Sequence, residues 1–148
     1  MAYRIPSTER VRDAVRRVLS RDRSAASLHE LTRLVRAELE EDDPRFRVGP
    51  ERIRRLASRM NAVRTSIHTR RGATRDATAG CPVCGGRLEV VRNRTLRGDD
   101  VALEARCTEC PYWTGREKRV PVRYAFHLRE WRFAKAPRRR PEGPIETE

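Results

Sequence analysis

Apolar residues in the first seventy positions recur at the spacing of amphipathic helices. Behind a candidate N-cap at Ser7 or Thr8, one stripe with the spacing i, i+3, i+4, i+7, i+8 consists of Val11, Ala14, Val15, Val18 and Leu19. Ser27 followed by Glu30 is a capping box, and the stripe behind it consists of Leu28, Leu31, Leu34, Val35 and Leu39. A third helix begins at Gly49-Pro50; its inward positions are Ile53, Leu56, Ala57 and Met60. The pattern therefore predicts three short helices.

The pattern changes after the third helix. Residues 63–70 alternate between apolar or threonine positions and basic or polar ones, which predicts a strand that turns at Arg71-Gly72. Residues 72–80 are small and polar, so we expect a turn tip and linker there. From residue 133 the chain is rich in Pro, Arg and Glu without periodicity, which predicts a disordered tail over 133–148.

The four cysteines form two CxxC pairs, Cys81/Cys84 and Cys107/Cys110. Two such pairs can place four thiolates tetrahedrally around one ion, so the spacing predicts one structural Zn(II) per chain. A site closed by four cysteines leaves no coordination position for hydrolytic chemistry. Two disulfides would require an oxidising compartment, and a redox dithiol would require one CxxC in a βαβ context. A four-cysteine iron site fits the same spacing.

Three strand-like runs accompany the cysteines, at residues 88–91, 101–105 and 120–126. We expect them to form one three-stranded sheet, with Arg97-Gly98-Asp99-Asp100 as a turn and with Tyr112 and Trp113 covering its apolar side. The metal would then stabilise a unit too small to bury a core of its own.

Composition and charge limit the class of binding partner. The formal net charge is +13, and all basic residues except Lys118 and Lys135 are arginine, so the chain is drawn to polyanions. The absence of a long apolar run and of an apolar N-terminal segment predicts a cytoplasmic protein without membrane contact.

The order of three helices, a strand and a basic turn resembles a winged helix-turn-helix, and the paired cysteines resemble the zinc ribbon family. We therefore expect an α+β chain, with a winged helix at 1–71, a wing tip and linker at 72–80, a three-stranded zinc ribbon at 81–132 and the tail at 133–148. A wing needs a returning strand, and residues 73–80 carry no bulky apolar residue to anchor one. The domain order is similar to that of the large subunit of archaeal transcription initiation factor E. This resemblance implies an archaeal DNA-binding, transcription-associated protein.

We expect a non-enzymatic nucleic-acid-binding protein, with duplex DNA favoured over RNA and with RNA polymerase or the ribosome as further partners. The third helix would enter the major groove and the basic turn would touch the backbone; the expected contacts are Arg52, Arg54, Arg55, Arg59, Arg64, Arg70 and Arg71. An RNA- or ribosome-associated zinc ribbon is the alternative. A third possibility is a transcript-cleavage factor similar to elongation factor S, in which Asp99 and Asp100 would hold a metal ion in the polymerase.

Overall fold

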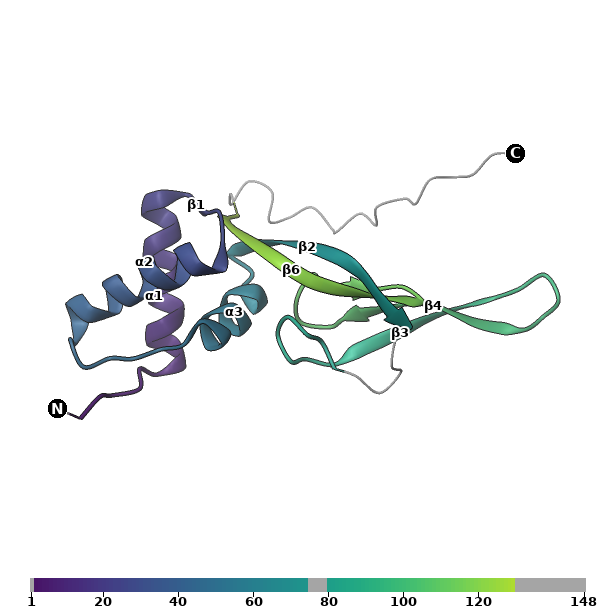
Figure 1. Ribbon diagram of the computed structural model, residues 1–148, viewed down its shortest axis with the longest axis horizontal. Coiled ribbons are helices and arrows are strands. Elements are labelled where there is room, and N and C mark those ends of the chain that lie inside the picture. Colours follow the sequence, from purple (N-terminus) through teal and green to yellow (C-terminus); the bar gives the residue numbers. More distant parts are fainter. Residues whose placement is uncertain (1, 75–79, 130–148) are drawn as a thin grey trace.

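The computed structural model describes residues 2–74 and 80–129, and its architecture is α+β (Figure 1). Three helices gather at one end of the molecule. Two long strands, β2 and β6, run from the helices toward a second sheet, and the hairpin of that sheet projects away from the helices at the far end (Figure 1).

The three predicted helices are confirmed as α1 (Thr8–Asp22), α2 (Leu28–Asp42) and α3 (Pro50–Arg59). The Ser7 side chain accepts a hydrogen bond from the Arg10 amide at the start of α1. In the capping box before α2, Ser27 Oγ accepts from the Glu30 amide at 3.1 Å. The predicted stripe of α1 is fully buried, and Leu31, Val35 and Leu39 of α2 lie in the same core.

The first sheet is antiparallel, with strand order β1-β6-β2. Its strands are β1 (Ser24–Ala25), β6 (Glu117–Leu128) and β2 (Val63–Thr74). The register of β2 with β6 runs from Val63 opposite Leu128 to Thr74 opposite Glu117.

Two sequence predictions are wrong here. The run 120–126 was expected in the sheet of the cysteines, but it lies in β6, because Phe126 is fully buried in the core formed by the helices. Residues 72–74 were expected in a linker, but they continue β2. Gly72 is required there, since a Cβ atom would lie 2.7 Å from Val120 Cγ2.

The strand that returns along β2 is therefore β6, residues 117–128. In the sequence, residues 75–116 connect the two paired strands. This stretch includes all four cysteines and the second sheet. Residues 75–79 of the expected linker and the expected tail at 133–148 lie outside the described residues.

The second sheet has strand order β3-β4-β5 and is also antiparallel. β3 (Leu88–Arg94) and β4 (Asp100–Cys107) form the projecting hairpin, and the two-residue β5 (Trp113–Thr114) is its third strand. The sequence analysis predicted β3 and β4 correctly. It expected residues 120–126 as the third strand of this sheet, but that strand is β5.

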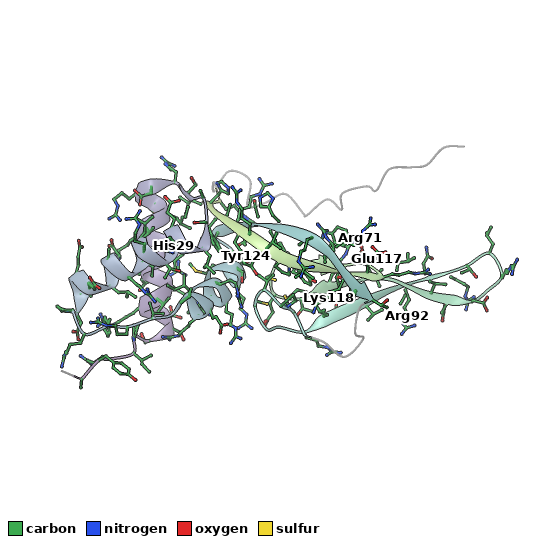
Figure 2. All side chains as sticks on the ribbon, in the orientation of Figure 1. His29, Arg71, Arg92, Glu117, Lys118 and Tyr124 are labelled. Carbon is green, nitrogen blue, oxygen red and sulfur yellow. The ribbon has the colours of Figure 1, made fainter. Side chains whose placement is uncertain are left out.

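One face of the first sheet carries two apolar clusters. Val63 and Phe126 belong to the large cluster with the helices, and Ile67 and Tyr124 pack against a smaller cluster around the cysteines. These residues share a face because the register places Thr65 opposite Phe126 and Ile67 opposite Tyr124. Figure 2 shows Tyr124 between the helices and the second sheet. None of the helices in the described residues combines the length and the apolar character that a membrane crossing requires.

Phe126→Ala tests the assignment of β6 to the helical core. Removing this buried ring leaves a cavity, so we expect the free energy of unfolding to fall by about 3–5 kcal/mol, with cooperative loss of the helical circular dichroism signal at lower denaturant. Leu103→Ala is the control, because Leu103 is 47% exposed on the hairpin. Equal stability of the two variants would contradict the assignment.

Candidate metal centre and the arginines of α3

The four cysteine sulfurs converge between the two sheets. All four Sγ atoms lie within 4.8 Å of one another, with 3.5 Å between Cys81 and Cys110 and 3.4 Å between Cys84 and Cys107. Metal–sulfur bonds of about 2.3 Å in a tetrahedron require sulfur–sulfur edges of about 3.8 Å. These separations are too long for disulfides. The four cysteines are therefore positioned to hold one metal ion.

Backbone amides surround the sulfurs in the same way in both CxxC turns. The second cysteine of each pair accepts a hydrogen bond from the amide two residues later, and the first accepts from the amides two and three residues later. The donor amides are those of Val83 and Cys84 to Cys81, of Gly86 to Cys84, of Glu109 and Cys110 to Cys107, and of Tyr112 to Cys110. Amide donors of this kind stabilise thiolates, which are the metal-binding form of cysteine.

These contacts shift the pKa values of Cys81 and Cys110 in opposite directions. The Cys110 thiol hydrogen-bonds to Cys81, and this bond, with the backbone amides, lowers the pKa of Cys81 to about 5. The same bond and burial raise the pKa of Cys110. A divalent cation at the centre would relieve the repulsion between neighbouring thiolates and displace the remaining protons.

The centre is closed to solvent on most sides. Cys81, Cys84 and Cys110 are buried together with Val83 and Tyr112, and Cys107 is half-buried. Four protein ligands in such a cluster favour a structural role.

Gly85 and Gly86 allow the chain to turn over the sulfurs. Gly85 has a φ of +76°, which side chains rarely adopt. A Cβ atom on Gly86 would lie 3.1 Å from Cys84 Sγ and 2.7 Å from a Glu109 carboxylate oxygen. A side chain at residue 86 would therefore require the Glu109 carboxylate to move and the Cys84 sulfur to shift by a few tenths of an ångström.

Two of the arginines predicted to contact nucleic acid, Arg54 and Arg59, join α3 to the metal centre. Arg54 Nε donates to the Val83 carbonyl at 2.9 Å, and its guanidinium lies 5.9 Å from the centre of the Tyr124 ring. Arg59 donates to the Cys84 carbonyl at 2.8 Å and forms an ion pair with Glu109 at 3.2 Å. Because Val83 and Cys84 belong to one CxxC turn and Glu109 to the other, α3 contacts both turns.

The remaining predicted arginines do not form one surface. Arg52 donates to the Pro6 carbonyl at 2.7 Å. Arg55 is exposed beside Gly85, and its guanidinium group has no hydrogen bond or ion pair within the described residues. Arg64 lies on the face of the first sheet opposite to the apolar clusters, since its neighbours Val63 and Thr65 face inward.

Farther along β2, Arg70 is exposed and Arg71 forms an ion pair with Glu117 at 2.8 Å, which Figure 2 shows at the far end of the strand. A register shift between His68 and Thr69 separates these two arginines from Arg64. The expected basic turn is therefore part of a strand.

The sequence analysis missed residues that connect the two sheets. The Arg119 guanidinium on β6 lies 3.9 Å from the centre of the Trp113 ring and donates to Thr69 Oγ1. Tyr112 was correctly expected to cover the apolar side, and its hydroxyl donates to the Arg119 carbonyl. Glu109 lies inside a CxxC pair, but nothing in its spacing indicated a contact with Arg59.

Asp99 and Asp100 lie where the hairpin turns. The Asp99 backbone amide donates to Thr95 Oγ1, and the Thr95 amide donates to the Asp99 carbonyl. Asp100 begins β4 opposite Arg94. These contacts show that Asp99 stabilises the turn of the hairpin, which is a common role of aspartate.

Gly86→Ala tests the approach of the two CxxC turns. The added methyl group must displace a sulfur or the Glu109 carboxylate, so we expect metal affinity to fall about 10- to 100-fold, measured by competition with a chromophoric chelator. Gly115→Ala is the matched control, because no atom lies within 4 Å of the Cβ it would add. Equal metal affinity of the two variants would contradict the geometry.

Arg54→Gln/Arg59→Gln tests the connection between α3 and the metal centre. In the wild-type protein loaded with zinc, chelation should accelerate amide hydrogen exchange in α3, because the two turns that hold the helix lose their order. In the double variant, exchange in α3 should be faster and respond less to chelation. Arg12→Gln/Arg16→Gln, which removes two arginines paired with Glu9 and Asp13 on α1, is the control. Unchanged exchange in α3 of the first variant would show that the contacts do not hold the helix.

Comparison of the chain with protein-family models, with curated proteins and with solved structures finds no match. Likeness to a characterised protein therefore supplies no function. The cysteine cluster and the arginines around it are the features from which a function is argued.

Proposed function

We propose that this chain is a non-enzymatic DNA-binding protein, built as a winged helix with a zinc ribbon inserted between the two strands of its wing. The observation that carries the proposal is the pairing of β2 with β6. With it, the helices and the first sheet follow the order α1, β1, α2, α3, β2, β6, and the sheet has the order β1-β6-β2. This order supplies the returning wing strand that residues 73–80 do not provide.

Zn(II) is the metal that we propose for the cysteine centre. The donor set is all sulfur, the separations fit a tetrahedron, and the ligands are mostly buried. An ion held in this way would order both CxxC turns. Through Arg54 and Arg59 it would also hold α3 in place.

We propose α3 as the DNA-contacting helix, with Arg55 as its free cation. Ile53, Leu56 and Ala57 bury one side of the helix, Arg54 faces the metal centre, and Arg55 remains exposed without a partner in the described part of the chain. The major groove of B-DNA is wide enough for an α-helix, whereas the major groove of A-form RNA is too narrow and deep. Duplex DNA is therefore favoured over RNA.

Binding should depend mainly on phosphate contacts. Asn61 is the one amide side chain near α3, just beyond its C-terminal end, and amide side chains are the usual readers of adenine. The net charge of +13 supports strong attraction to any polyanion. Low sequence specificity is therefore part of the proposal.

Titration of duplex DNA at several salt concentrations tests the function. We expect affinity to fall steeply with salt, because each phosphate contact releases counterions. Arg55→Gln should weaken binding about tenfold without changing the melting temperature, since Arg55 has no partner in the described residues. Arg12→Gln, which removes a cation paired with Glu9, is the matched control for charge.

Two outcomes would contradict the proposal. One is an affinity for duplex DNA that changes little with salt. The other is a wide preference for ribosomal RNA fragments over duplex DNA, which would favour the RNA-associated alternative.

A further inference from the structure

The face of the first sheet that points away from the helices and the cysteines, the outward face, presents a set of polar and basic side chains. Strand register assigns them to one face: Arg64 is opposite His127, Ser66 is opposite Ala125, and His68 is opposite Arg123. β1 adds Ser24, which is also opposite His127. The residues that alternate with them, such as Val63, Thr65 and Phe126, point into the core.

This face carries cations without carboxylates. Neither Arg64 nor Arg123 forms an ion pair within the described residues, and the cross-strand partner of each is a histidine. Cross-strand partners usually stabilise a sheet through opposite charges or apolar contact, and neither arginine has such a partner. The fold therefore gains no cross-strand ion pair from these two cations.

Several arginines of α1, by contrast, are paired with carboxylates. Arg12 pairs with Glu9, Arg16 pairs with Asp13, and Arg17 pairs with Glu38 and Asp42. The two arginines of the outward face thus differ from these three arginines of α1, whose charges are balanced by carboxylates.

The shape of this face suits an extended anionic chain. Arg64 and Arg123 are separated by four residues of strand register, about 13 Å along the strands. The small side chains of Ser66 and Ala125 lie between them. The surface between the two guanidinium groups therefore carries no bulky side chain. Guanidinium groups and imidazole N–H groups both donate to phosphate oxygens.

We propose that the outward face, centred on Arg64, Ser66, His68, Arg123 and His127, is a second contact surface for the phosphate backbone of nucleic acid. The inference rests on the proposed function for the class of partner, but it uses a different surface. Arg55 lies beside Gly85, and the CxxC turns pack with Ile67 and Tyr124 on the inward face. A straight duplex along α3 therefore does not cover the outward face, and the protein can hold two nucleic-acid segments at once.

A bridging assay tests this surface. Full-length, zinc-loaded protein is mixed with an immobilised duplex and a fluorescent duplex of unrelated sequence, and capture of the fluorescent duplex is measured. The wild type should capture it. Arg64→Gln/Arg123→Gln should lose most of this capture while retaining binding to a single duplex, and the slope of log affinity against log salt for the weaker site should fall by about 2. Arg12→Gln/Arg16→Gln, which removes the same charge from α1, should capture like the wild type.

The outcomes separate this inference from the proposed function. If Arg55→Gln weakens single-duplex binding and Arg64→Gln/Arg123→Gln bridges normally, α3 binds DNA and the outward face does not. If Arg55→Gln has no effect and Arg64→Gln/Arg123→Gln abolishes single-duplex binding, the outward face binds nucleic acid and the role proposed for α3 is wrong. If the wild type binds one duplex without bridging, or if an acidic polypeptide such as polyglutamate outcompetes DNA at this face, the inference is overturned.

Discussion

The pairing of β2 with β6 is the constraint on which the rest of the structure depends. It brings residue 63 to residue 128 and residue 74 to residue 117. The chain from 75 to 116 must therefore leave this sheet and return to it. The cysteine-bearing segment is thereby attached at both ends to the same two strands. Because β6 is also the middle strand beside β1 and carries Phe126 into the helical core, the two parts of the molecule share one structural element.

The metal centre is connected to α3 as well as to the sheet. Arg54 and Arg59 satisfy carbonyls of one CxxC turn, and Glu109 of the other turn pairs with Arg59. Carbonyls at such a turn are directed outward from the sulfurs, and guanidinium groups are strong donors to them. Ordering of the sulfurs and orientation of the helix are therefore coupled, which gives a structural metal an influence on the proposed nucleic-acid contact.

Arginines of the described residues differ in what surrounds them. Arg12 and Arg16 on α1 pair with carboxylates one turn away, and Arg54 and Arg59 bind within the protein. Arg55, Arg64 and Arg123 have no partner in the described residues and lie on opposite sides of the first sheet. These three guanidinium groups are free to interact with phosphate, whereas those held within the protein are not, so total charge alone does not locate the contact surface.

The sequence by itself determined the three helices, their apolar stripes and the four cysteines that could hold a metal ion, because helical periodicity and CxxC spacing are local properties. It also indicated β2, β3 and β4. Only the tertiary structure decided the partner of each strand: residues 120–126 alternate in the same way whichever sheet they join, and burial of Phe126 selects the helical one. The roles of Arg54, Arg59 and Arg64 likewise depend on what folds against them, since an arginine on a helix or strand has the same local pattern whether it meets a carbonyl, a carboxylate or water.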